Sequence, residues 1–496
     1  MKSAVDDILA AVANRAEATR QPVYLVGGAV RDRVLGKPIH DLDFVMTSPT
    51  LPLAKRLADE LGGGLYVMDV ERDITRVVLM DGAERLVLDF SALRGPDLDA
   101  DLRARDYTIN AMAMEVRPPQ TLIDPCGGLA DLHERRLRAC GPTSLSDDPA
   151  RVLRGVRLAL SLSARIDPQT QDWMRAAAPL LARVSMERQR DELFKMLEGP
   201  RPATAMEVAD HMGILRHVLP ELEEMKGVTQ SPPHVHDVWT HTLEVMKRLE
   251  QLWGVLVGDY REGSAEGLIL ATAVTWLGRY REQFAAHFDA GLATDRSIRG
   301  LVMLAALYHD VAKPASRSVE ESGRIRYFEH DDRGAEVAAL RARTLALSGD
   351  EVSRLQTLIA GHMRVHHLAD QPEPPTRRAI YRYFKALGAA GIDLCLFSLA
   401  DTWATYSHTL PQEAWLAELR VCRALLEARW EHNEAIVEPP RLVSGGEVMR
   451  ELKLKAGPAV GRALEAVREA QAEGLVNTPE EALAFLRGWR DEETQG

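Results

Sequence analysis

The sequence predicts an α+β protein in which a small mixed sheet at the N-terminus is followed only by helices. Short runs of β-forming residues recur between residues 23 and 90. After about residue 145, alanine, leucine, glutamate and arginine dominate at helical spacing to the end of the chain. The 496 residues suffice for roughly three domains, and the 46% content of hydrophobic residues is ordinary for a globular protein.

The predicted elements follow one another closely in the first 90 residues. We expect an amphipathic helix over 1–20, strands at 23–26, 42–46, 65–70, 76–80 and 85–90, and helices at 29–35 and 51–61. Breaks rich in proline lie at 199–200, 231–233, 371–375 and 438–440. They divide the chain into a head (1–140), a helical neck (141–230), a histidine-rich helical domain (231–410) and a helical tail (411–496).

Composition limits the classes of function. The apolar runs are short and interrupted by charge, and the N-terminus has no signal-peptide pattern, so we expect no membrane span. The four cysteines are scattered without a CxxC pair, which is typical of reduced thiols in a cytoplasmic protein. The net charge of −12 disfavours a dedicated nucleic-acid binder, but arginines between 135 and 201 form a local basic strip that can hold phosphates.

A glycine turn between a predicted strand and a predicted helix is the first candidate site. Gly27 and Gly28 allow backbone N–H groups to approach a phosphate closely, and the start of the helix adds partial positive charge. Arg31 lies one turn further and could reach the same anion. Most turns of this kind only separate two elements, so the turn alone does not define a site.

Two carboxylates follow on the next predicted strand. Asp41 and Asp43 share one face of it, about 7 Å apart by strand rise, and repel each other unless a cation lies between them. Oxygen ligands suit Mg²⁺, and paired ions of this kind promote transfer of a phosphoryl group. An exposed edge strand or an Asx-turn is the alternative, which the nearby glycine turn makes weaker. Asp89 in 86–90 is either a third metal ligand or a strand-end aspartate.

These motifs resemble the first motif of class II tRNA nucleotidyltransferases and bacterial poly(A) polymerases, members of the DNA polymerase β superfamily. Four further segments resemble the later motifs of that family, in the same order: 105–113, 124–132, 147–157 and 187–195. The family usually has a second arginine where Ala104 stands, and Glu where Asp147 stands. The resemblance implies a nucleotidyltransferase head with Mg²⁺ as cofactor, and binding of the nucleotide ribose by the segment that contains Arg105, Asp106 and Asn110.

The fourth of these motifs has a pattern that suits base recognition. Asp148 and Arg151 are three residues apart on a predicted helix and together offer an acceptor and a planar donor fork. This combination can match the Watson–Crick edge of cytosine or adenine, and the family uses such a pair in place of a nucleic-acid template. Arg154 and Arg157 continue the row toward a triphosphate. A solvated ion pair is the alternative.

Histidines and aspartates recur in the predicted third domain. His241, His309, Asp310 and Asp401 follow the order H…HD…D, which resembles the HD-superfamily phosphohydrolases. Imidazole and carboxylate together suit Mn²⁺, Ni²⁺ or Zn²⁺, and Mg²⁺ is a further option. Two more candidates complete a second metal site, namely His330 and His362. A lone buried histidine is more often a hydrogen-bonded core residue.

Several functions remain open from sequence alone. The first is template-independent addition of C, A or both to tRNA 3′ ends from CTP and ATP. The connection from Asp89 to Arg105 is short, and the resemblance associates a shortened segment there with addition of CC alone. A-only addition and poly(A) synthesis are further options. The other classes are an HD phosphohydrolase whose head presents RNA, and a non-catalytic RNA-binding protein, which has no use for paired carboxylates. The sequence indicates no protein partner.

Overall fold

The chain forms two compact units that each have their own core. The computed structural model describes residues 2–19, 21–39, 41–47, 49–81, 84–257, 267–293 and 296–489. One unit comprises Met1–Glu192 and Val208–Val218, and the other comprises Leu193–Glu207 and Leu219–Gly496. These two units are broader than the head, neck, histidine-rich domain and tail, so that finer division stays a prediction.

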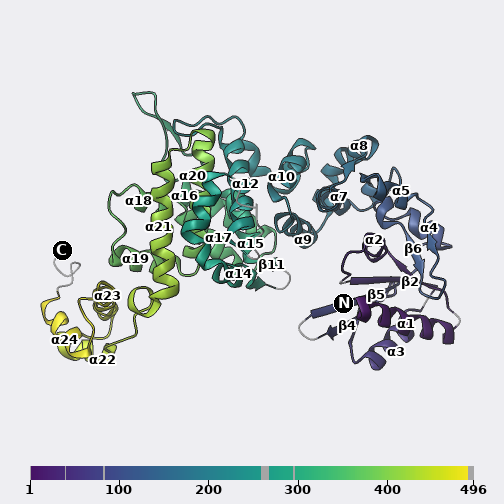
Figure 1. Cartoon of the computed structure of the whole chain (residues 1–496), viewed down its shortest axis with the longest axis horizontal. Coiled ribbons are helices and arrows are strands. Elements are labelled where there is room, and N and C mark those ends of the chain that lie inside the picture. The colour runs from purple at the N-terminus through teal and green to yellow at the C-terminus, as the bar shows by residue number, and fades with distance from the viewer. Residues whose placement is uncertain are drawn as a thin grey trace. The chain divides into compact units, whose positions relative to one another are not determined.

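A seven-stranded mixed sheet organises the first unit (Figure 1). Its strands stand in the order β3-β4-β5-β2-β1-β6-β7. Their bounds are β1 Val23–Val26, β2 Asp41–Met46, β3 Gly64–Asp69, β4 Ile74–Asp81, β5 Glu84–Ala92, β6 Ala113–Glu115 and β7 Leu122–Ile123. Strands β2 and β5 run parallel, and the other neighbours are antiparallel. The predicted α+β class and all five predicted strands are confirmed.

Alternation of side chains explains why these segments form a sheet with one buried face. Phe44 on β2 and Phe90 on β5 are buried and stack with ring centroids 4.9 Å apart. Helix α3, Leu51–Leu61, contacts β3 and β4 and ends at Gly62, whose positive φ of 69° suits glycine. The predicted helix over 1–20 is α1, Lys2–Thr19, and contacts α3. Strands β6 and β7 were not predicted, because three and two residues are too short to show a period.

Helices complete the first unit and connect the later motifs. The main ones are α2 Gly28–Val34, α4 Leu98–Arg103, α6 Ser144–Asp147, α7 Ala150–Ser161, α8 Pro168–Ala177 and α9 Met186–Leu197. The Tyr107 hydroxyl donates to the Arg151 carbonyl oxygen over 2.8 Å. A Cβ atom at Gly155 would lie 2.0 Å from the same hydroxyl, so this close approach requires glycine. The second and fourth motifs are therefore packed against each other.

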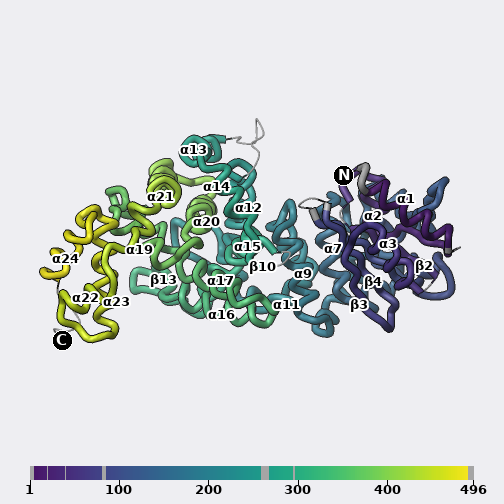
Figure 2. Tube along the Cα trace, turned by 90° about the horizontal axis from the view of Figure 1, so that it is seen from below, coloured from purple at the N-terminus to yellow at the C-terminus, as the bar shows by residue number. Residues whose placement is uncertain are grey.

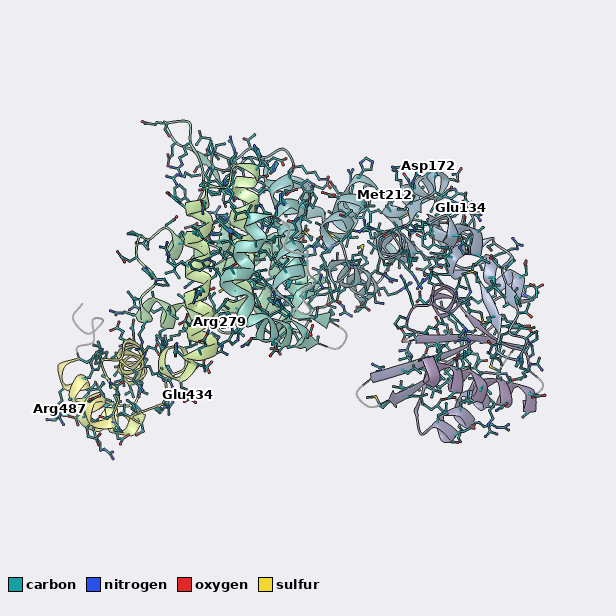
Figure 3. All side chains as sticks on the ribbon, viewed as in Figure 1. Glu134, Asp172, Met212, Arg279, Glu434 and Arg487 are labelled. Carbon is teal, nitrogen blue, oxygen red and sulfur yellow. The ribbon has the colours of Figure 1, made fainter. Side chains whose placement is uncertain are left out.

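The second unit is helical apart from short two-stranded ladders. Its principal helices are α12 Val238–Leu256, α13 Leu268–Leu277, α15 Ile298–Tyr308, α16 His330–Thr344, α17 Gly349–Gly361, α18 Arg364–Ala369, α19 Arg377–Leu387, α20 Ala390–Tyr406 and α21 Gln412–Glu431. Arg279, labelled in Figure 3, pairs with Glu431 near the end of α21. Helices α22 Gly445–Leu452, α23 Pro458–Glu473 and α24 Pro479–Gly488 share a small core and lie together at the C-terminal end in Figure 2.

Within the described ranges, no single helix is long and apolar enough to cross a membrane. One bent pair, Arg377–Leu387 with Ala390–Thr409, meets the length and composition criteria together across a 105° bend.

Candidate active site and metal centre

The sheet brings the predicted carboxylates of the head together. Asp43 on β2 stands in register with Asp89 on the parallel strand β5, and Asp41 lies two residues earlier on the same face. The pKa of the Asp43 carboxyl is raised to about 6, chiefly by burial and also by the neighbouring Asp89 and Asp41, against the opposing effect of Arg105 and Arg154. An excess of buried negative charge fits a divalent cation with oxygen ligands.

Asp89 is already held by an arginine. Arg76, its cross-strand partner on β4, donates from Nε and Nη2 to the two carboxylate oxygens, each over 2.7 Å. Among the described residues, the sets of three ligand atoms within 4.8 Å of one another lie in the histidine-rich region and not in the head. The head therefore offers the pair Asp41 and Asp43, and the role of Asp89 as a third ligand stays a prediction that requires release from Arg76.

The glycine turn packs directly against this pair. Gly27 has a φ of 72°, and a Cβ atom there would lie 3.5 Å from Asp43 Oδ2 and 3.4 Å from Arg105 Nη1. Arg31 is engaged, because it pairs with Asp32 over 2.8 Å and donates to Asn110 Oδ1 over 2.6 Å. The turn, the carboxylate pair and Arg105 thus meet in one place, whereas Arg31 ties the first motif to the second.

Asp106 connects the second motif to the arginine row. It is buried, accepts from Asn110 Nδ2 over 3.3 Å, and pairs with Arg154 Nε over 3.1 Å. Arg157 is paired with Glu192 over 2.7 Å, and its contact with a triphosphate stays a prediction. Arg154 lies beside Asp106 of the second motif.

The prediction that Asp148 lies on a helix with Arg151 is wrong. Helix α7 begins at Ala150, and Asp148 is extended (φ −143°, ψ 91°) because the following Pro149 disfavours helical geometry at its predecessor. Asp148 and Arg151 still approach to 3.7 Å. Arg188 on α9, which the sequence prediction did not assign to the site, donates to both oxygens of Asp148 over 2.9 and 2.8 Å.

A cavity of ≈ 1370 Å³ opens beside Asp148 and is large enough for a nucleotide. Its walls come from β4, β5 and the neck segments. They comprise Glu71, Arg72, Asp73, Ile74, Ser91, Ala92, Leu93, Arg94, Ala104, Ser146, Asp147, Asp148, Pro149, Arg151, Arg183, Val184, Ser185 and Arg188. The candidate base-reading pair thus faces a space that a base can occupy.

Removal of the Arg188 guanidinium should weaken discrimination between nucleotides. Burial acts to raise the pKa of Asp148, but the hydrogen bond and charge of Arg188 together with the charge of Arg151 outweigh it, so this pKa is lowered and the acceptor stays ionised. We expect Arg188→Ala to reduce the preference for CTP or ATP over UTP and GTP by about 10-fold, measured as kcat/KM for each nucleotide. Arg175→Ala, which removes an exposed ion pair on α8, is the control. Unchanged selectivity in Arg188→Ala would contradict this role.

Six predicted ligands converge in the second unit. One set comprises His241, His309 and Asp401, and the other comprises Asp310, His330 and His362; within each set the ligand atoms lie within 4.8 Å of one another. Asp310 joins the two sets, since its carboxylate lies 3.1 Å from His309 Nε2 and 3.5 Å from His330 Nε2. This arrangement matches a two-ion centre with a shared carboxylate.

Hydrogen bonds orient three of these rings toward the centre. The Nδ1–H groups of His309, His330 and His362 donate to backbone carbonyl oxygens three residues earlier, over 2.8, 2.8 and 2.6 Å. Each Nε2 then points inward, as in metal-binding histidines. His241 Nε2, His309 Nε2 and both Asp310 oxygens are buried and make no hydrogen bond of good geometry, although Lys313 Nζ lies 2.7 Å from Asp310. Buried imidazole nitrogens and carboxylate oxygens that converge in this way fit a divalent metal.

The sequence prediction missed three residues that lie beside these ligands. His366 donates to Asp401 over 3.0 Å through Nε2, and its Nδ1 lies 2.7 Å from the buried Glu418 carboxylate. Lys313 Nζ lies 2.7 Å from Asp310. His366 falls four residues after His362 and Lys313 three after Asp310, so helical spacing could have suggested both. Glu418 lies on α21, far along the sequence, and no sequence pattern links it to the site.

The fold and the head motifs together define the class of a nucleotidyltransferase. The poly A polymerase head domain family matches residues 23–138, and the family described as the probable RNA and SrmB-binding site of polymerase A matches residues 165–226. A solved CCA-adding enzyme with CTP has a TM-score of 0.62 at 21% identity and covers 97% of this chain and 94% of its own. At that identity the likeness shows the fold alone.

Curated relatives define the family more narrowly. The A-adding tRNA nucleotidyltransferase of Deinococcus radiodurans is 34% identical over 94% of this chain and 95% of the relative. The CC-adding tRNA nucleotidyltransferase of Thermus thermophilus is 33% identical over 95% of this chain and 94% of the relative. The chain belongs to the tRNA nucleotidyltransferase family. These two relatives are nearly equally similar to this chain and differ in the nucleotide that they add. Sequence identity therefore does not determine which nucleotide this chain adds.

Proposed function

We propose that the chain extends tRNA 3′ ends with cytidine, adenosine or both, using CTP and ATP and releasing pyrophosphate. The observation that carries this proposal is the carboxylate pair Asp41 and Asp43 on one strand, with Asp43 against the Gly27 turn, in a chain of this family. Solved structures of similar fold include a Thermotoga maritima CCA-adding enzyme complexed with tRNA, and CCA-adding enzymes with CTP and with ATP. They support tRNA and both nucleotides as substrates.

Residues of the head and of the neck divide the work of the reaction. Asp41 and Asp43 would hold Mg²⁺, which would supply positive charge to the α-phosphate and to the leaving pyrophosphate. The Gly27 turn allows close approach of backbone to phosphate. Asp106 and Asn110 lie where a ribose can be held by hydrogen bonds, and Arg154 beside them supplies positive charge. Asp148 and Arg151 present an acceptor and a donor to the base.

The product can be read directly from three starting RNAs. Transfer RNAs that end at the discriminator base, at C and at CC are each incubated with CTP, ATP or both, and the 3′ ends are sequenced. Addition restricted to C, as the short connection from Asp89 to Arg105 implies by resemblance, gives CC on the first two RNAs only. Unlimited A addition would instead indicate poly(A) synthesis. Absence of addition to all three RNAs would overturn the proposal.

A second activity is favoured by the histidine-rich region. We propose that it is an HD-type phosphohydrolase centre that holds Mn²⁺, Ni²⁺, Zn²⁺ or Mg²⁺ and hydrolyses phosphate esters. The convergence of buried imidazole nitrogens and carboxylate oxygens in the two sets supports this proposal. The bound ions would supply an activated water and a Lewis acid. The protein residues hold the inward ring orientation and a shared carboxylate.

Glu418 contacts His366, which donates to the predicted ligand Asp401, and loss of the Glu418 contact should weaken metal binding. We expect Glu418→Gln to lower the affinity for Mn²⁺ about 10-fold or more, because outer contacts orient metal ligands and typically change affinity 10–100-fold. His366→Gln should act in the same direction. Titration calorimetry with Mn²⁺ measures the effect, and Glu413→Gln, exposed on the same helix α21, is the control. Equal affinities for Glu418→Gln and Glu413→Gln would refute this role.

The remaining assignments complete the proposal. We infer a cytoplasmic location, which the four free cysteines support. We also retain the division into head, neck, histidine-rich domain and tail. The pair Asp41 and Asp43 argues against a non-catalytic RNA-binding protein, because like charges forced together cost stability without a cation.

A further inference from the structure

The face of the sheet that carries Asp43 is only partly covered along β4 and β5, and we call it the open face. On β5, buried Leu88 and Phe90 alternate with the half-buried side chains of Val87 and Asp89. On β4, the buried set is Thr75, Val77 and Leu79, and the opposite set is Ile74, Arg76, Val78 and the exposed Met80. Helix α3 contacts β4. One face is therefore core, and the other is available to a ligand.

A row of side chains crosses this open face from the catalytic pair to the sheet edge. Strand pairing aligns Asp43 with Asp89, Asp89 with Arg76, and Arg76 with Tyr66 on the edge strand β3. Tyr66 is 56% exposed. A Cβ atom at Gly64 would lie 3.2 Å from Tyr66 Cε2, so the Tyr66 ring lies next to Gly64, which has no side chain. Three strand spacings separate Tyr66 from Asp43, or about 14 Å.

The nucleotide cavity lies on the other side of the carboxylates. Ile74 and Ser91 line that cavity and are paired with each other, two residues from the row of Asp43. Asp41, Val87 and Val78 stand two residues from the same row in the opposite direction. Along the strands the order is therefore the cavity, the row of Asp43, and then Asp41 with Val87 and Val78, which lie on the open face farther from the cavity. A second substrate can therefore reach the carboxylates across the open face.

We propose that the single-stranded 3′ end of the RNA substrate lies on this open face, with a base stacked on Tyr66. The proposal rests on the proposed transferase function, since the reacting 3′-hydroxyl must reach Asp41 and Asp43. Stacked nucleotides are about 3.4 Å apart. The distance of about 14 Å from Asp43 to Tyr66 therefore places the base on Tyr66 roughly four nucleotides from the 3′ terminus.

The chemistry of the open face fits single-stranded RNA. Proteins bind such strands through aromatic rings that stack on bases, next to basic side chains that attract the backbone. Tyr66 supplies the ring, and the exposed Arg85, aligned with Met80, supplies positive charge on the same face. Pairing of the edge strand β3 with a second copy of the chain is the competing use of this edge.

The test compares two exposed side chains on opposite faces of β3. Tyr66→Ala should raise KM for tRNA five-fold or more and leave KM for CTP and ATP within two-fold, whereas Tyr66→Trp should keep KM for tRNA near the wild-type value. Val67→Ala is the matched control, because Val67 is 51% exposed on the other face. Melting temperatures check that each variant folds.

Three outcomes would overturn the proposal. They are an equal effect of Tyr66→Ala and Val67→Ala on KM for tRNA, a rise in KM for the nucleotides, and an unchanged KM for tRNA accompanied by loss of a dimer in light scattering. The last result would assign the edge to self-association. Failure of the transferase assignment itself is distinguishable, because the wild-type protein would then extend no RNA.

Discussion

Asp43→Asn should abolish nucleotide incorporation and at the same time stabilise the metal-free protein. Burial raises the pKa of Asp43 from 3.8 to about 6. The folded state therefore holds the proton more tightly than the unfolded chain, and the ionised carboxylate costs stability at every pH above about 6. We expect incorporation to fall at least 10³-fold, and the melting temperature at pH 7.5 to rise by about 2–8 °C, which corresponds to roughly 1–3 kcal/mol.

The pH and metal dependence separate this account from simple damage to the fold. The stability gain should disappear as the pH falls from about 6 toward 4, where Asp43 is protonated in the wild type. Mg²⁺ should raise the melting temperature of the wild type and not that of the variant, because only the wild type binds it. Asp59→Asn, exposed on α3, should change neither quantity. Loss of stability in Asp43→Asn at pH 7.5 would contradict the site described here.

Asp310→Asn should remove the second centre and leave the first intact. Asp310 is 1% exposed and lies close to ligands of both sets. Its loss removes the shared carboxylate, so we expect the affinity for Mn²⁺ to fall more than about 100-fold. Hydrolysis of bis(p-nitrophenyl) phosphate should fall to background. Incorporation of nucleotide into tRNA should stay within two-fold, since Asp41 and Asp43 are untouched.

Asp310→Asn needs two controls, because the buried Lys313 lies beside Asp310. Lys313 loses its carboxylate partner in Asp310→Asn and keeps its hydrogen bond to Gln230, so circular dichroism must show that the helices persist. Asp332→Asn, exposed on α16, should leave metal binding and hydrolysis unchanged. If Asp310→Asn retains wild-type metal affinity, the six residues do not form a metal centre.

Periodicity explains why the larger elements could be predicted from the sequence. The segment 74–79 alternates half-buried and buried side chains, and the predicted strand 76–80 lies within β4. Strand β6 has only three residues and carries no comparable signal. The extended backbone of Asp148 could have been anticipated from Pro149, but the spacing of charges suggested a longer helix.

The candidate sites were predictable where the ligands lie close together in sequence. Asp41 and Asp43 share a strand, and His309 and Asp310 are adjacent. Contacts across many residues were not predictable, because no local pattern links their partners. Arg188 reaches Asp148 across 40 positions, and Glu418 reaches His366 across 52. Arg76 was passed over because a charged residue on a half-buried strand face is ordinary.

Incorporation of labelled CTP and ATP into a tRNA that lacks its 3′ end, compared between the wild type and Asp43→Asn, tests the central claim most directly. The claim is that the carboxylate pair of the head transfers nucleotides without a template. The account predicts that the wild type adds C, A or both in the presence of Mg²⁺, and that the folded Asp43→Asn protein adds neither. Incorporation by Asp43→Asn at the wild-type rate, or none by the wild type, would contradict it.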